Sequence, residues 1–219
     1  MKELHVHEIT GRSLVPAKDI PALLDENHIE FQGIDCVNWN AYPYRPEVEF
    51  RMAHTGEAIL LNYRVKEESV RAVAAEDNGR VWEDSCCEFF FQLPEDQEEN
   101  IYYNFECNCG GTLLIGGGRP GDRPHAPLEI TRKVDRWTSL DKAPFEERMG
   151  ECSWQLALCI PKEAFFRHQL KGFKGMAAHA NFYKCGDKQH TPHFLSWNKI
   201  DLPEPCFHCP EFFGKILFE

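Results

Sequence analysis

Apolar and polar residues alternate over several short stretches of this chain, a pattern typical of half-buried β-strands. The first stretch with this alternation reads Val48, Glu49, Phe50, Arg51, Met52. A second apolar stretch, residues 58–65, follows a turn at His54–Gly56, and we expect the two to pair as a hairpin.

Further segments rich in aromatic and β-branched residues lie between turn-forming Gly, Pro, Asn and Asp residues. They are residues 87–93, 101–109, 111–116, 152–161, 175–185, 193–200 and 212–219. Short helices are predicted at residues 19–24 and directly after Pro161. The pattern therefore predicts a mostly β fold, an antiparallel β-sandwich of jelly-roll or immunoglobulin-like type with one or two short helices. We expect a single domain over residues 1–219, with residues 1–30 as an N-terminal approach segment.

Side chains on successive strand residues point to opposite faces, so the predicted strands can be divided into two faces. The apolar face should be buried between the sheets, together with Trp154, and carries Phe89, Phe91, Tyr103 and Phe105. If the strands at 87–93 and 101–109 pair, their other face carries Glu88, Gln92, Asn104, Glu106 and Asn108. Trp82 precedes this strip of carboxylates and amides.

A strip of this kind suits a neutral ligand with many hydroxyl groups. Carboxylates and carboxamides can bind vicinal hydroxyls, and an indole offers a flat face to the C–H groups of a sugar. The other interpretation is that an exposed sheet face is simply polar and solvated.

The charge of the chain bears on its partners. With 35 acidic and 24 basic residues the formal charge is −11, and no basic stripe is visible. Nucleic acid and anionic membrane surfaces are therefore not expected partners. The N-terminus lacks the apolar core of a signal peptide, which favours a cytoplasmic location unless a signal has been removed.

Ten cysteines are many for this length, but they lie in strand-like segments, as in "SCCEF" and "CNCGG". We interpret them as reduced thiols. A zinc site is the first alternative, since Cys206 and Cys209 form a C-x-x-C motif around His208. Its second ligand pair would have to come from Cys185 with His190 or His193, a loose match, and no stoichiometric zinc is expected.

A glycoside hydrolase is the second alternative function. Glu83, Asp84, Glu88 and Glu106 could supply a catalytic acid and base. A catalytic acid needs an apolar pocket that raises its pKa, whereas the predicted strip is open and polar. No catalytic residue is therefore assigned.

Five motifs make the chain resemble the family 9 carbohydrate-binding modules, especially their stand-alone relatives. They are "WEDSCCEFFF", "YYNFECNCGGTLL", "ANFYKCGD", "HFLSWNKID" and "PEFFGKILFE", in the family's order. The resemblance implies a β-sandwich that binds a mono- or oligosaccharide non-catalytically between two tryptophans. It implies Trp82 as the first wall, Trp197 as the second, Glu88 as a hydroxyl acceptor and Asn104 as a further contact.

Further sugar contacts are expected at Glu106, Asn108 and Asn181. Some family members hold structural calcium, so calcium is compatible with the resemblance, although no cofactor is required and no metal ligands are assigned. Residues 116–127 and the "CFHCPEFF" segment differ from the generic family pattern. We therefore expect ligand choice to differ as well.

Overall fold

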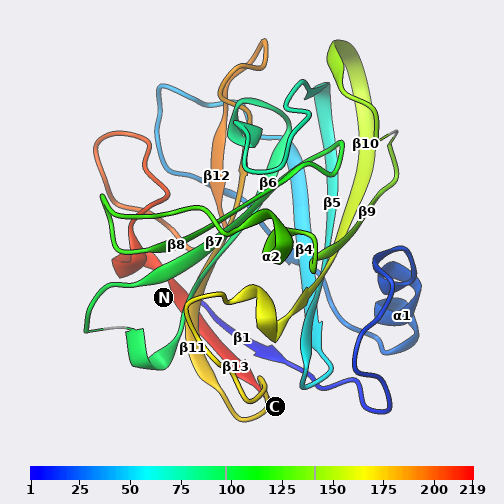
Figure 1. Ribbon diagram of the computed structural model, residues 1–219. Coiled ribbons are helices and arrows are strands. Elements are labelled where there is room, and N and C mark those ends of the chain that lie inside the picture. Colours follow the sequence, from blue (N-terminus) through cyan, green and yellow to red (C-terminus); the bar gives the residue numbers. More distant parts are fainter. Residues whose placement is uncertain (97, 141) are drawn as a thin grey trace.

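Two β-sheets face each other in the computed structural model of the protein, which describes residues 1–96, 98–140 and 142–219 (Figure 1). The eight-stranded sheet has the path β1 (Glu3–Val6), β13 (Gly214–Phe218), β11 (Ala177–Cys185), β6 (Cys86–Gln92), β7 (Tyr102–Asn108) and β8 (Leu113–Gly118). Off this path, β12 (Phe194–Ser196) pairs with β11 and with β3 (Cys36–Val37). The five-stranded sheet has the order β2 (Gln32–Gly33), β4 (Glu47–His54), β5 (Ala58–Ala72), β10 (Phe145–Pro161) and β9 (Asp135–Thr138).

The predicted mostly β sandwich is confirmed. The hairpin predicted from the first alternating stretch is β4 paired antiparallel with β5, with Val48 opposite Val65 and Met52 opposite Leu61. The strands β6, β7 and β11 are likewise antiparallel neighbours, whereas β1 and β13 run parallel. The alternation of side chains therefore identified both the strands and their faces.

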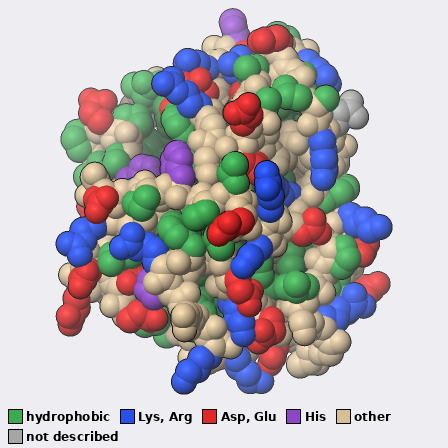
Figure 2. All heavy atoms as spheres, in the orientation of Figure 1, with side chains coloured by type: hydrophobic (Ala, Val, Ile, Leu, Met, Phe, Trp, Pro, Cys, Tyr) green, Lys and Arg blue, Asp and Glu red, His purple; other side chains and the backbone are tan. Residues whose placement is uncertain are grey.

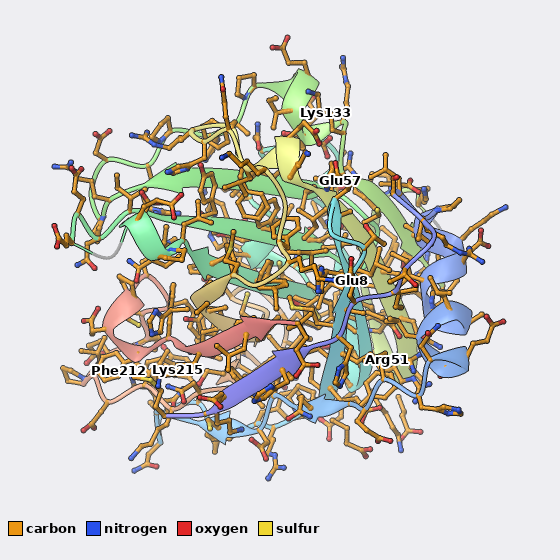
Figure 3. The ribbon with its side chains drawn as sticks, turned by 90° about the horizontal axis from the view of Figure 1, so that it is seen from below. Glu8, Arg51, Glu57, Lys133, Phe212 and Lys215 are labelled. Atoms are coloured by element: carbon orange, nitrogen blue, oxygen red, sulfur yellow. The ribbon has the colours of Figure 1, made fainter. Side chains whose placement is uncertain are left out.

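The space between the sheets is filled by apolar side chains, as Figure 3 shows from below. The five side chains predicted to be buried there are all at most 2% exposed: Phe89, Phe91, Tyr103, Phe105 and Trp154. Burial of aromatic side chains on this scale is the main favourable contribution to folding.

The helices of the protein are short. They are α1 (Ile20–Glu26) and α2 (Leu128–Thr131), with 3-10 turns at η1 (Ala17–Asp19), η2 (Val81–Glu83), η3 (Pro94–Asp96), η4 (Lys162–Ala164) and η5 (Pro210–Phe212). The longer helix, α1, packs on the outer face of the five-stranded sheet, where Arg51 of β4 donates hydrogen bonds to Asp25 and to the Pro21 carbonyl. No helix in the described ranges is long and apolar enough to cross a membrane.

The helix predicted after Pro161 is wrong, because only the 3-10 turn η4 forms there. Phe165 leaves the helical path and is fully buried among Phe91, Tyr103 and Phe105. Burial of this aromatic side chain outweighs the modest local preference for helix.

A buried ion pair joins the two sheets. Lys184 of β11 and Glu67 of β5 are both fully buried, and Lys184 Nζ lies 2.9 Å from Glu67 Oε2. The same amine lies 2.7 Å from His193 Nε2, and Glu67 Oε1 accepts a hydrogen bond from the Trp154 indole at 2.7 Å. Each of these two buried charges therefore compensates the other, and removal of either residue would leave an unpaired charge between the sheets.

Candidate functional site

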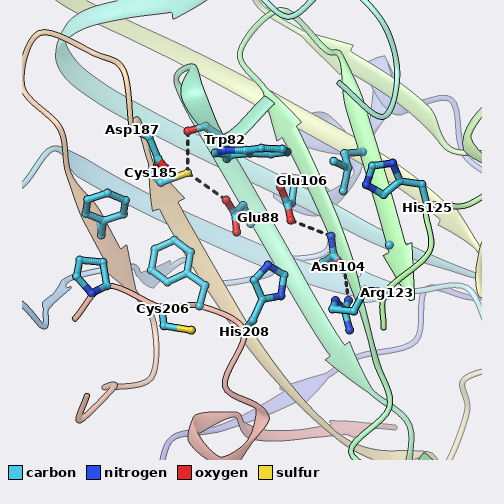
Figure 4. Close-up of a pocket in the computed structure, with 15 residues that line it drawn as sticks. Trp82, Glu88, Asn104, Glu106, Arg123, His125, Cys185, Asp187, Cys206 and His208 are labelled. Atoms are coloured by element: carbon cyan, nitrogen blue, oxygen red, sulfur yellow. Dashed lines mark hydrogen bonds between the residues drawn. The ribbon is translucent and has the colours of Figure 1, made fainter. Parts of the chain in front are cut away.

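A pocket of about 440 Å³ lies on the outer face of the eight-stranded sheet, over β6, β7 and β11 (Figure 4). Two loops border it: residues 119–127 (the 119–127 loop), and residues 197–209 between β12 and η5 (the 197–209 loop). The pocket is lined by Trp82, Glu88, Asn104, Glu106, Leu114, Gly116, Arg123, His125, Cys185, Asp187, Phe194, Pro205, Cys206, Phe207 and His208.

The face expected to be an open polar strip is therefore a covered pocket. Glu88 is only 3% exposed, Asn104 3% and Glu106 4%. The prediction placed these side chains on the correct face but missed the loops that cover them. Figure 2 shows one face of the molecule, on which basic and acidic side chains are interspersed and a hollow is bordered by hydrophobic and histidine side chains.

Two buried carboxylates form the floor of the pocket. Glu88 of β6 and Glu106 of β7 are direct cross-strand partners, so their side chains lie on the same face of the sheet. The Cys185 thiol donates a hydrogen bond to Glu88 Oε1 at 3.0 Å, and Asn104 Nδ2 donates one to Glu106 Oε1 at 2.8 Å. Burial raises the pKa of Glu106 to about 7. Burial also holds the pKa of Glu88 well above its usual range, and the neighbouring Cys185 and Glu106 raise the pKa of Glu88 further.

The raised pKa of Glu106 predicts a pH-dependent stability. Folding favours the protonated carboxyl, so this contribution is complete below the ordinary pKa of 4.5 and is lost as the pH rises through about 7. The unmodified protein should lose on the order of 2 kcal/mol of unfolding free energy between pH 5 and pH 8, and Glu106→Gln should abolish this loss. Urea unfolding at both pH values measures this loss, with Glu129→Gln, an exposed substitution, as the control. Equal pH dependence in Glu106→Gln and the unmodified protein would contradict it.

Arg123 fixes the orientation of Asn104. The guanidinium lies 3.6 Å from the Tyr102 ring centroid and donates hydrogen bonds to the carbonyls of Tyr102 and Gly118 and to Asn104 Oδ1. The amide nitrogen of Asn104 is thereby turned toward Glu106. A Cβ at Gly116 would lie 2.5 Å from Asn104 Oδ1, so the amide occupies space that only glycine leaves free.

Trp82 lies at the edge of the pocket on the 3-10 turn η2 and is half-buried. In the view of Figure 4 its indole lies above Glu88 and Glu106, and His208 lies below them. The Trp82 carbonyl accepts hydrogen bonds from the Asp187 N–H at 3.1 Å and from the Cys185 thiol at 3.6 Å. These two contacts anchor the turn to the end of β11.

The acidic neighbours of Trp82 are structural. Asp84 is 1% exposed, and its carboxylate accepts hydrogen bonds from the N–H groups of Val73 and Ala74. Glu83 forms ion pairs with Arg80 and Lys188 at the surface. Neither lines the pocket, so of the acids near Trp82 in the sequence only Glu88 reaches it.

The prediction that Trp197 forms the second wall of the site is wrong. Trp197 is 1% exposed and lies between the sheets, with its ring edge-on to Phe50 at 5.9 Å and to Phe182 at 5.6 Å. Side chains alternate along β12, so Leu195 and Trp197 join the core while Phe194 faces the pocket. The aromatic residues that line the pocket with Trp82 are His125, Phe194, Phe207 and His208.

Asn108 and Asn181 are on the predicted face but do not reach the pocket. Asn108 donates hydrogen bonds to Asp84 and the Ala74 carbonyl and accepts them from backbone N–H groups of the following turn. Asn181 likewise donates to backbone carbonyls of the 197–209 loop and η5 and accepts from Asn198 N–H. Their hydrogen-bonding groups are used within the fold, so neither side chain is free to contact a ligand in this pocket.

The residues of the proposed zinc site are not brought together. Cys206 is exposed and Cys209 is buried, with its thiol 3.2 Å from the Cys206 carbonyl. His208 Nδ1 lies 2.9 Å from the Tyr102 hydroxyl, and His193 lies beside Lys184. Cys185 lies instead on the pocket floor.

Sequence reasoning missed most of the loop residues that line the pocket. Arg123, His125, Phe207 and His208 come from segments without periodicity. The available signal was the long Gly/Pro-rich stretch after residue 116, since such loops often carry function.

Comparisons with known proteins agree with this fold. A structure of a proposed carbohydrate-binding protein from Bacteroides uniformis ATCC 8492 is 56% identical, with a TM-score of 0.96, covering 100% of this chain and 99% of that one. A family 9 carbohydrate-binding module from Caldicellulosiruptor kristjanssonii, solved with glucose, is 12% identical with a TM-score of 0.60, covering 100% of this chain and 96% of that one. A structure of a family 9 module from the same organism in complex with cellotriose is 13% identical with a TM-score of 0.61, covering 100% of this chain and 94% of that one.

No curated protein matches the chain. The sequence model of carbohydrate-binding family 9 matches residues 18–218, which is nearly the whole length. Together with the sandwich fold, this match identifies the chain as a non-catalytic binding module rather than a hydrolase. The chain belongs to carbohydrate-binding family 9.

Proposed function

We propose that the pocket beneath Trp82 binds one end or a short segment of a sugar, with Glu88, Asn104 and Glu106 contacting its hydroxyl groups. The observation that supports this most is the unused hydrogen-bonding capacity of the floor. Hydrogen bonds from the described residues reach only Oε1 of Glu88 and Oε1 of Glu106. The second oxygen of each carboxylate is thus left for a hydroxyl donor.

The walls suit the apolar faces of a sugar ring. Trp82, Phe194 and Phe207 line the pocket, and an aromatic face packs well against sugar C–H groups. The protein itself supplies the polar and apolar contacts, so the proposed binding requires no cofactor. The glucose and cellotriose complexes of the Caldicellulosiruptor kristjanssonii module support glucose and short glucans as first ligands to test.

A second hollow, of about 920 Å³, lies against the five-stranded sheet and is a weaker candidate. Four of its charged residues form ion pairs across the hollow, Glu47 with Lys66 and Glu49 with Arg64. Its tryptophan, Trp154, is 2% exposed and donates its indole N–H to Glu67. It therefore offers no free aromatic face.

Calorimetric titration with glucose and cellotriose tests the proposal. We expect one binding site per chain. Glu88→Gln should weaken affinity up to about tenfold, because it replaces one of the two carboxyl oxygens and a typical hydrogen bond is worth roughly 0.5–1.5 kcal/mol. The control, Glu47→Gln in the second hollow, should bind as the unmodified protein does. Loss of affinity in Glu47→Gln with normal binding in Glu88→Gln would place the sugar in the other hollow.

A further inference from the structure

Three side chains that commonly bind metals lie together at one end of the pocket floor. Cys86 and Glu88 are two residues apart on β6 and so point to the same face, and Cys185 is the direct cross-strand partner of Cys86 on β11. One ligand atom from each lies within 4.8 Å of the others. All three residues are at most 3% exposed.

The carboxylate in this cluster has no basic partner among the described residues. Lys184 points to the other face of the sheet and pairs with Glu67, and Lys188 pairs with Glu83. Arg123 binds the neutral Asn104. Glu88 instead accepts a hydrogen bond from the Cys185 thiol. A buried carboxylate without a counter-ion is costly, and a metal cation would compensate it.

The donor set fits a thiophilic divalent ion. Tetrahedral zinc holds thiolate sulfur at about 2.3 Å and carboxylate oxygen at about 2.0–2.2 Å, which places ligand atoms roughly 3.5–3.8 Å apart. The present cluster needs shifts of about an ångström at most to reach this spacing. Calcium takes six or more oxygen ligands, so this set does not suit it.

The surroundings leave room for a fourth ligand. Glu88 and Cys185 line the pocket, so water can reach an ion held between them. The Trp82 carbonyl, which now accepts a hydrogen bond from the Cys185 thiol, also accepts one from the Asp187 N–H. Loss of the thiol proton therefore does not leave this carbonyl without a donor.

We propose that Cys86, Glu88 and Cys185 bind a thiophilic divalent cation such as Zn²⁺, with water from the pocket as the fourth ligand. The ion displaces the protons of the two thiols and of the Glu88 carboxyl, which leave to solvent, and it is bound by two thiolates and one carboxylate. No oxidation or reduction is involved. This site is distinct from the C-x-x-C motif at Cys206 and Cys209. It shares Glu88 with the proposed sugar site, but metal binding does not require the sugar.

Cobalt substitution tests the site, because thiolate–Co²⁺ bonds absorb in the near ultraviolet while oxygen and nitrogen ligands do not give this band. Fully reduced protein should take up one Co²⁺ per chain with a thiolate charge-transfer band, and Zn²⁺ should displace it. Cys86→Ser should lose at least half of the band's intensity, since it removes one of the two thiolates. The matched control is Cys87→Ser, since Cys87 is the next residue on β6, is equally buried, and faces the core between the sheets.

Circular dichroism of each variant establishes that it is folded, and Cys86→Ala provides a second variant if Cys86→Ser does not fold. A folded, reduced protein without the charge-transfer band overturns the proposal. A band that keeps its full intensity in folded Cys86→Ser also overturns it, because Cys86 would then not be one of the ligands. Sugar titration of metal-free protein is a separate readout, so failure of the metal site and failure of sugar binding can be told apart.

Discussion

Trp82→Ala is expected to weaken sugar affinity at least about tenfold, equivalent to roughly 1.4 kcal/mol or more. Trp82 has the largest aromatic surface among the pocket-lining residues, and its removal takes away one wall as well as the stacking face. The melting temperature should fall only modestly, because the indole is half-buried at the edge of a small apolar cluster. Calorimetric titration with cellotriose measures the affinity, and thermal unfolding measures the stability.

The matched control is Trp137→Ala. Trp137 is also half-buried, but it lies on β9 of the other sheet and packs on the apolar cluster beneath α1. A comparable loss of stability with unchanged sugar affinity is expected. The proposed role of Trp82 would be contradicted if both variants lost affinity equally, or if Trp82→Ala bound sugar normally.

Lys184→Met is expected to destabilise the fold by about 3–5 kcal/mol, because it leaves the Glu67 carboxylate buried without its cation. Methionine retains much of the volume of the lysine stem, so the cost is mainly electrostatic. Urea unfolding at pH 7 measures the change in free energy. The double variant Lys184→Met, Glu67→Gln should recover part of the loss, since it removes the uncompensated charge.

A surface lysine provides the comparison for this prediction. Lys188 pairs with Glu83, but its side chain is 58% exposed. Lys188→Met should therefore change stability by about 1 kcal/mol or less. If Lys184→Met cost no more than Lys188→Met, the buried ion pair would not be an important link between the sheets.

Side-chain alternation in the sequence predicted the core and the floor of the site in physical detail. Phe89, Phe91 and Phe105 occupy alternate strand positions and are buried between the sheets. The same alternation placed Glu88 and Glu106 together on the opposite face, where they are direct cross-strand partners. A period of two residues is a property of the extended backbone, so it can be recognised without knowledge of the tertiary structure.

The depth of the pocket and its second aromatic wall could not be predicted in the same way. Arg123 and His208 reach the pocket from loops, whose paths depend on tertiary contacts rather than on periodicity. The error at Trp197 was avoidable, because alternation along residues 194–197 places Phe194 and Trp197 on opposite faces. The motif resemblance directed attention to the tryptophan, but the backbone geometry turns Phe194 toward the pocket.

The location of the bound sugar can be measured directly through the five tryptophan indole N–H groups. Trp137 and Trp154 lie on the five-stranded sheet, whereas Trp82 lies on η2 at the pocket. Two-dimensional NMR during titration with glucose and then cellotriose follows all of them at once, with the Trp82 resonance assigned from its absence in Trp82→Phe. The Trp82 indole should shift first and most, while those of Trp137 and Trp154 stay in place. A saturable shift at Trp137 or Trp154 with the Trp82 resonance unmoved would contradict sugar binding in the pocket beneath Trp82.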